Sequence, residues 1–174
     1  MEISSWLLLL YTLPTKRTTA RVNLWRKLKK FGAVQLKTSG YVLPNDATQI
    51  ERFQWLATQI RDAGGEATLV RVAQIEGMSN QQIVQMFNDA RAGEYNELIG
   101  TCRSTLASHK KGEDGELAAV LEQQQRRFRE IKGIDYFKSP SADDAQMVLQ
   151  RLEKLLVPKK SGAARPKLDS GKFE

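Results

Sequence analysis

The sequence predicts an α+β fold, in which an antiparallel sheet carrying two helices is followed by a helical hairpin and one further helix. Two observations lead to this class. Strand and helix patterns alternate over the first 77 residues, whereas from residue 78 to 157 glycine is sparse and helix-forming residues dominate. We therefore expect one unit over residues 1–77 and a second over residues 78–157. Residues 158–174 are rich in Lys, Gly, Ser and Pro, which predicts a basic disordered tail.

The composition favours a soluble, cytoplasmic protein with no membrane partner. The chain has 174 residues, of which 41% are hydrophobic, and this is enough to bury a core. The longest apolar run, residues 6–11, is too short to span a bilayer, and residues 1–5 lack the positive charge of a signal peptide. Cys102 is the single cysteine, so we expect no internal disulfide and a packing role for this side chain.

A continuous apolar run of strand length opens the fold. Residues 6–11 read Trp-Leu-Leu-Leu-Leu-Tyr and are closed by Leu13 and Pro14. Both alternating sets of side chains are apolar, so we expect a central strand whose two faces are both covered. Two helices of the same unit cover one face. The other face is left either to the C-terminal helices or to a second copy of the chain in a homodimer.

A strongly basic amphipathic helix follows this strand and ends at Gly32. Residues 16–30 contain seven Lys or Arg and no Asp or Glu, whereas the whole chain has 27 basic and 20 acidic residues and a net charge of +7. At 100° per residue, Arg26, Lys29 and Lys30 lie opposite an apolar stripe. That stripe consists of Ala20, Leu24, Leu28 and Phe31. So concentrated a positive field points to an anionic partner.

Two strands, a helix and a last strand complete the first unit. Residues 33–37 and 41–43 predict strands joined through residues 38–40, and residues 67–75 predict the last strand. A second helix is expected over roughly residues 47–63. Its mostly one-sided apolar pattern consists of Ile50, Phe53, Trp55, Leu56 and Ile60. The order strand, helix, strand, strand, helix, strand is that of the ferredoxin-like fold, with both helices on one face of the sheet.

Helical periodicity predicts the second unit. Ser79 is a good N-cap for a helix whose apolar stripe pauses at Gly93 and reaches about Ser108. A polar loop over residues 109–115 then reverses the chain. The return helix has a coiled-coil-like seam with a polar break, formed by Leu117, Leu121, Gln124, Phe128 and Ile131. A final helix starts near residues 139–141, and its expected buried face consists of Ala145, Val148, Leu149, Leu152, Leu155 and Leu156.

The sequence contains no pattern typical of catalysis or of a metal site. His109 is the one histidine, and it lies in a polar loop without an Asp or Ser motif around it. The glycine turns lack the lysine and spacing of a phosphate-binding loop. Glu113, Asp114 and Glu116 match no calcium-loop spacing. We therefore expect a protein that is not an enzyme and that uses no cofactor.

A series of short motifs runs from about residue 5 to about residue 157. They read Leu13-Pro14-Thr15, Thr19-Ala20-Arg21, Leu24-Trp25-Arg26-Lys27-Leu28-Lys29, Gly32-Ala33, Gly40-Tyr41-Val42-Leu43-Pro44, Gly64-Gly65-Glu66-Ala67, Glu94-Tyr95-Asn96-Glu97-Leu98 and Ile134-Asp135-Tyr136-Phe137. Their order and spacing resemble the N-terminal domain of the chromate-resistance regulator ChrB. More distantly, the first 77 residues are similar to the ferredoxin-like part of the phenylacetate-degradation repressor PaaX.

The resemblance implies a cytoplasmic bacterial transcriptional regulator of a chromate-resistance operon that responds to chromate. Members of the family continue into a second domain, so chromate sensing by this chain is left open. The small CRISPR-associated nucleases are also ferredoxin-like and use an aspartate near the end of the first strand. Residues 10–13 hold no carboxylate, so nuclease activity is not expected.

Two functions remain open at this stage. In the first, basic side chains of the helix neutralise DNA phosphates, and the basic tail helps. The nucleic-acid-binding residues are then Arg17, Arg21, Arg26, Lys27, Lys29 and Lys30. No helix-turn-helix spacing is present, so base reading is not predicted. In the second, a small-oxyanion-sensing or protein-interaction module holds chromate or sulfate at the helix start, where unpaired amides favour anions. The anion-binding residues are then Thr15, Lys16, Arg17, Thr18 and Arg21. Otherwise the threonines serve only as a helix cap and the basic face is merely solvated.

Overall fold

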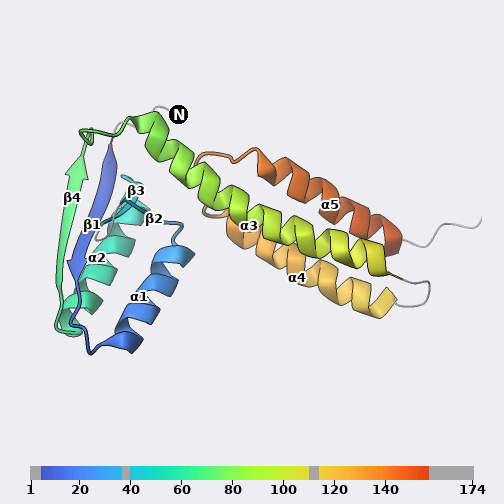
Figure 1. The fold of residues 1–174 in the computed structure, drawn as a ribbon, viewed down its shortest axis with the longest axis horizontal. Helices are drawn as coiled ribbons and strands as arrows, with labels where there is room; N and C mark the ends of the chain where they lie inside the picture. Colours follow the sequence, from blue (N-terminus) through green and yellow to red (C-terminus); the bar gives the residue numbers. More distant parts are fainter. Residues whose placement is uncertain (1–4, 37–39, 110–113, 157–174) are drawn as a thin grey trace, which may run out of the picture.

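The computed structural model describes residues 5–36, 40–109 and 114–156 and shows a mixed α/β protein (Figure 1). Within these ranges, an antiparallel sheet is followed by a bundle of helices, as predicted. In chain order the elements are β1 (Trp6–Thr12), α1 (Thr18–Lys30), β2 (Val34–Gln35), β3 (Gly40–Pro44), α2 (Ala47–Asp62), β4 (Glu66–Val72), α3 (Asn80–Ser108), α4 (Asp114–Lys132) and α5 (Ser141–Leu156). The predicted tail lies outside the described residues, as do the turn expected at residues 38 and 39 and most of the loop after His109.

β1 lies inside the sheet, as its apolar character predicted. The strand order is β2-β3-β1-β4, and every neighbouring pair is antiparallel. Leu8 of β1 stands opposite Val42 of β3 and Val70 of β4. Two strands are shorter than expected, because β2 is confined to Val34–Gln35 and β4 ends at Val72.

α1 and α2 cover one face of the sheet (Figure 1). Leu7 and Leu9 of β1 are buried in the same core cluster as Leu24 and Leu28 of α1. α2 begins where the side chain of Asp46 accepts a hydrogen bond from the Gln49 amide, which satisfies one of the unpaired donors of its first turn. The apolar stripe predicted for α1 therefore faces the sheet and fixes which side of that helix points outward.

The other face of the sheet is covered by α3 and the segment between α4 and α5, but only at the Trp6 end of β1. The ring of Trp6 stacks on Phe87 of α3 at a centroid distance of 6.0 Å and meets Phe137 edge-on. Its indole Nε1 also donates to Asn80 at 2.8 Å. At the other end of β1, Leu10 is 41% exposed. The expectation that β1 is covered on both faces is thus confirmed at Trp6 and wrong at Leu10.

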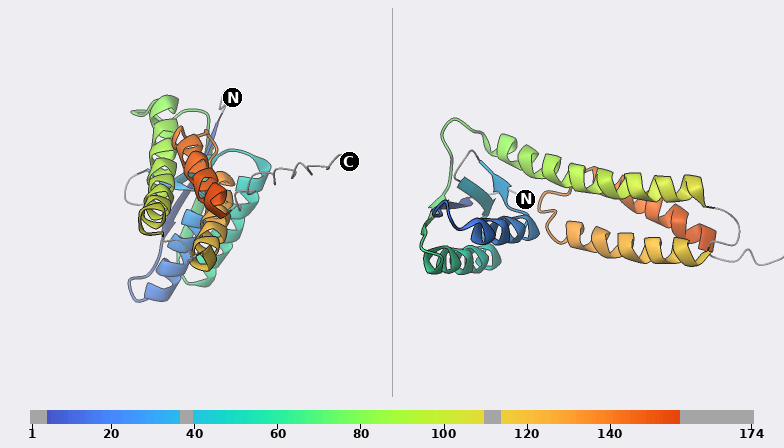
Figure 2. Two further views of the ribbon diagram at one scale, coloured as in Figure 1. Left: turned by 90° about the vertical axis from the view of Figure 1, so that its right-hand side faces the viewer. Right: turned by 60° about the horizontal axis from the view of Figure 1, so that its bottom comes forward.

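α3 is a continuous helix that connects two hydrophobic cores (Figure 2). It passes through Gly93 without interruption, and its start is closed by a reciprocal capping box between Ser79 and Gln82. Its first turns contribute Ile83 and Phe87 to the core beside the sheet. The turns after Gly93 belong to a second core shared with α4 and α5. The helix is therefore packed on the sheet at one end and in the bundle at the other.

Two apolar side chains expected in helix cores are exposed. Trp55 of α2 is 50% exposed, and Leu155 of α5 is 49% exposed. Both stand one position away from residues that are buried or half-buried, Leu56 and Leu156, so the true apolar stripes are narrower than the sequence pattern suggested. Within the described ranges, every helix is too short or too polar to cross a lipid bilayer.

Cys102 is fully buried in the second core, as expected, and we predict that it resists alkylation. Burial raises the pKa of its thiol to about 11, so the reactive thiolate is scarce at neutral pH. Iodoacetamide at pH 7.5 should leave the native protein unlabelled and should label it fully in urea, as read by mass spectrometry. Rapid labelling of the native protein would show that the bundle core opens readily.

Candidate nucleic-acid interface

α1 and the turn before it expose most of their cations to solvent. Leu24 and Leu28 anchor the helix on the sheet, which leaves its other side outward. No acidic residue lies in its first turn, and its last turn holds three lysines, where the negative end of the helix dipole favours cations. The exposed basic residues on this segment are Lys16, Arg17, Arg21, Arg26, Lys29 and Lys30. The predicted basic face is thus open to an anionic partner.

Within the part of the chain that the structure describes, no carboxylate lies within 4.0 Å of an α1 cation. Among the described residues, the ion pairs are Arg91–Glu94, Arg127–Glu97 and His109–Asp114, and none of them involves α1. Exposed charges of one sign without counter-charges within 4.0 Å attract mobile ions, which a polyanion displaces on binding. The surface therefore keeps the charge that a phosphate chain needs.

Lys27 differs from the other predicted phosphate ligands. It is only partly exposed, and its Nζ donates to the side chain of Gln59 on α2. The same Nζ lies 4.2 Å from the centroid of the Trp55 ring, in a cation–π arrangement. These contacts hold the ammonium against α2, so Lys27 contributes less to the outward field than its neighbours do.

A groove of about 660 Å³ separates the end of α1 from the helical bundle. Trp25, Arg26, Lys29 and Lys30 line one wall, and the facing wall carries Glu94, Glu97, Arg127 and Glu130. Two of these glutamates already have partners on the bundle, since Glu94 pairs with Arg91 and Glu97 with Arg127. Burial raises the pKa of Glu94, and Arg91 and then Lys29 oppose this shift. Two of the three glutamates on the bundle wall are thus paired within the bundle, and Lys29 of α1 adds an electrostatic attraction to one of them, Glu94.

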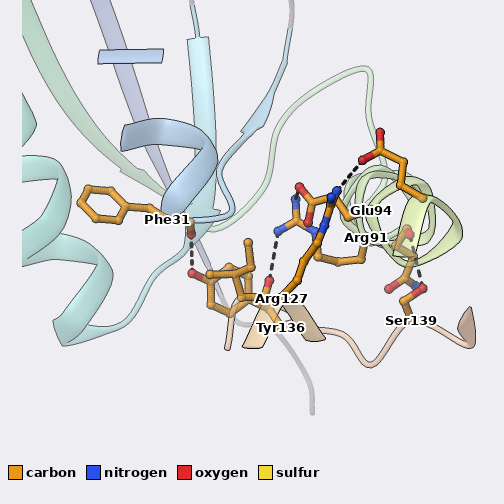
Figure 3. Close-up of polar contacts among 9 residues, drawn as sticks. Phe31, Arg91, Glu94, Arg127, Tyr136 and Ser139 are labelled. Carbon is orange, nitrogen blue, oxygen red and sulfur yellow. Dashed lines mark hydrogen bonds and ion pairs between the residues drawn. The ribbon is translucent and has the colours of Figure 1, made fainter. Parts of the chain in front are cut away.

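A polar junction fixes α1 relative to the bundle (Figure 3). The hydroxyl of Tyr136, in the segment between α4 and α5, donates to the carbonyl of Phe31 at 2.6 Å. The buried guanidinium of Arg91 pairs with Glu94 at 3.2 Å and lies 3.5 Å from the carbonyl of Ile134. Tyr136 thus joins the C-terminal end of α1 to the α4–α5 segment, and Arg91 joins that segment to α3, so the groove has two positioned walls.

The start of α1 has no side-chain cap. The N-cap is Arg17, whose side chain makes no capping hydrogen bond, so none of the threonines caps the helix. Thr15, Lys16, Arg17 and Thr18 lie together in this turn and are exposed. Arg21 lies one turn further on, where its Nη2 donates to the carbonyl of Leu13 at 2.7 Å. The predicted anion-binding residues are therefore close in the chain, with Arg21 directed toward the end of β1.

Sequence reasoning missed the aromatic residues beside the cations. Trp25 is 51% exposed, and Lys29 Nζ lies 5.6 Å from the centroid of its ring. Tyr11 and Tyr41 stack on the sheet with ring centroids 6.2 Å apart. Helical spacing already placed Trp25 outside the apolar stripe, which was the available signal. The pairing of Tyr11 with Tyr41 depends on the strand register and had no local signal.

Comparison with known proteins gives two matches and one negative result. A family model described as "Protein ChrB, N-terminal" matches residues 21–158. The curated protein named "Protein ChrB" from Cupriavidus metallidurans is 28% identical over 144 residues, which is 83% of this chain and 44% of the relative. No solved structure matches the chain. The chain thus spans less than half the length of the curated relative.

Proposed function

Because the chain belongs to the family of ChrB N-terminal domains, we propose that it is a transcriptional regulator of a chromate-resistance operon and binds DNA through α1. The single observation that carries the DNA-binding part is the set of exposed cations, without a carboxylate partner among the described residues, on a helix held by its apolar stripe. Arg17, Arg21, Arg26, Lys29 and Lys30 neutralise phosphates, and Lys27 has a smaller share. Such a regulator acts in the cytoplasm and needs no catalytic residue.

The geometry favours backbone recognition of DNA over base reading. Arg26, Lys29 and Lys30 lie together on the side of α1 opposite its apolar stripe, and the helix is anchored to the sheet, so these three meet a phosphate chain as a fixed array. The glutamates on the bundle wall of the groove repel a polyanion and so disfavour its entry into the groove. We therefore place the phosphate path along the exposed side of α1, away from the bundle wall.

A mobility-shift assay tests the regulator proposal. The probes are the DNA upstream of the chain's own operon and an unrelated fragment of equal length, each with and without chromate. We expect both fragments to bind at low salt, because phosphate contacts are independent of sequence, and we expect chromate to weaken the operon complex. Failure to shift either fragment at low salt would contradict the DNA-binding proposal.

A second candidate function is oxyanion binding at the start of α1, favoured by the uncapped N-terminus beside Lys16 and Arg17. We predict that isothermal calorimetry detects chromate or sulfate binding to the chain, and that Arg21→Ala weakens it about tenfold. The loss of one charge-assisted hydrogen bond, about 1.5 kcal/mol, accounts for that factor. An unchanged titration in the variant, or no heat in the parent protein, would exclude this candidate.

We also assign the first unit to the ferredoxin-like fold. The element order over β1 to β4 and the sheet order β2-β3-β1-β4 support this assignment, together with two helices on one face. The remaining open part of the other face, around Leu10, is the place where a second copy of the chain in a homodimer would most readily pack.

A further inference from the structure

A pocket of about 460 Å³ lies where the end of β1 meets α1. It is lined by Tyr11, Thr12, Leu13, Arg21, Trp25 and Tyr41. Its volume falls within the range of small-molecule sites, about 300–1,000 Å³. Trp25 also lines the groove beside Arg26 and Lys29, so the pocket adjoins the cationic surface of α1.

Three aromatic rings shape this pocket. Tyr11 and Tyr41 come from neighbouring strands and stack with an interplanar angle of 26°. Trp25 comes from α1 and is half exposed, although a tryptophan gains free energy from burying its large apolar surface. The half-exposed Trp25 ring therefore offers a face on which another planar ring can stack, beside the tyrosine pair.

The polar groups of the pocket favour an anionic ligand. Arg21 is held by its hydrogen bond to the Leu13 carbonyl and has no carboxylate partner among the described residues. Burial raises the pKa of both Tyr11 and Tyr41, so their hydroxyls stay protonated and neutral at physiological pH. A fixed guanidinium repels the cationic ligands that aromatic cages otherwise select. The site instead suits a planar ring that carries negative charge.

The geometry points to a binding site for an unpaired nucleobase, stacked against Trp25 and the tyrosines, with its phosphate at Arg21. This inference rests on the proposed nucleic-acid function and deepens it, because the neighbouring α1 cations would hold the adjoining phosphates. Two sources share this chemistry: a free nucleotide, and an unstacked base within a DNA strand.

Fluorescence anisotropy with the full chain tests the inference. The labelled probes are a single strand of about 12 nucleotides and a duplex of the same sequence, with AMP as an unlabelled competitor. Trp25→Leu should weaken single-strand binding about tenfold, the loss expected from one stacked base, and should leave duplex binding within about twofold. Tyr41→Leu, a second variant, should act in the same direction.

Trp55→Leu is the matched control. Trp55 is exposed to the same degree as Trp25 and lies under a lysine, but it does not line this pocket. Lys27 keeps its hydrogen bond to Gln59 in this variant, so single-strand affinity should change by less than about twofold. Competition by AMP in the parent protein and not in Trp25→Leu identifies a free nucleotide as a ligand, whereas single-strand binding without AMP competition identifies a base within a strand.

The outcomes separate this inference from the DNA-binding proposal. Equal effects of Trp25→Leu and Trp55→Leu, or single-strand affinity no greater than that of the duplex, would overturn the nucleobase pocket while duplex binding stands. Absence of duplex binding at low salt would overturn the proposed function itself. Circular dichroism of each variant verifies that the half-exposed position 25 tolerates leucine without unfolding.

Discussion

Trp6→Ala is expected to lower the free energy of unfolding by about 3–5 kcal/mol, the usual cost of truncating a buried tryptophan. The Trp6 side chain is fully buried and stacks on Phe87, and Phe137 packs against it edge-on. The substitution also removes the donor that bonds Asn80 at 2.8 Å. Because these partners lie on α3 and on the α4–α5 segment, the loss loosens the sheet from the bundle. Urea denaturation followed by circular dichroism measures the change.

Trp55→Ala is the control for this experiment. It removes the same side chain from a half-exposed position on α2, so we expect a cost of about 1 kcal/mol or less. A similar loss of stability in both variants would contradict the described packing of β1 on α3.

Replacing Arg26, Lys29 and Lys30 together with alanine is expected to weaken duplex DNA binding about 100-fold at a fixed, low salt concentration. Each side chain is exposed and lacks an acidic partner among the described residues, so its removal deletes a phosphate contact worth about 1 kcal/mol. The helix should remain folded, because Leu24 and Leu28 still anchor it and alanine is a good helix former.

The matched control carries Arg103→Ala, Arg126→Ala and Arg151→Ala, three exposed cations of the bundle. It removes the same formal charge from the chain but none from α1. We expect it to weaken binding only a few-fold, through the net charge of the protein. If the two triple variants lost affinity equally, the interaction would depend on net charge and not on α1.

Local patterns predicted the helices and the outward direction of the α1 cations. A period of 3.6 residues determines which side of a helix is apolar, so the burial of Leu24 and Leu28 and the exposure of Arg26 and Lys29 follow from spacing alone. The N-cap at Ser79 and the central position of β1 were predictable for similar reasons, since each depends on residues near in the sequence.

Features that depend on distant contacts were not predictable. The apolar residues of β1 predict that both faces of the strand are covered, but they do not say by which element. Only the path of α3 shows that Phe87 packs on Trp6 and that Leu10 remains exposed to solvent. The contact of Trp55 with Lys27 of the neighbouring helix likewise had no signal in its own segment. The buried Arg91, whose partners include a carbonyl 43 positions away, had no sequence signal at all.

The aromatic pocket shows the same limit at the candidate site. Tyr11, Trp25 and Tyr41 belong to three elements, and each looks ordinary in its own segment. Only the pairing of β1 with β3, and the packing of α1 beside them, brings these rings together.

The salt dependence of duplex binding tests the central claim, that the α1 cations neutralise DNA phosphates, most directly. The logarithm of the binding constant should fall linearly with the logarithm of the salt concentration, with a slope of about −0.9 for each neutralised phosphate. We predict that the triple variant at positions 26, 29 and 30 has a slope shallower by about 2.7 than the parent chain, because three contacts are gone. A parent slope close to zero, or equal slopes in the two proteins, would contradict the claim.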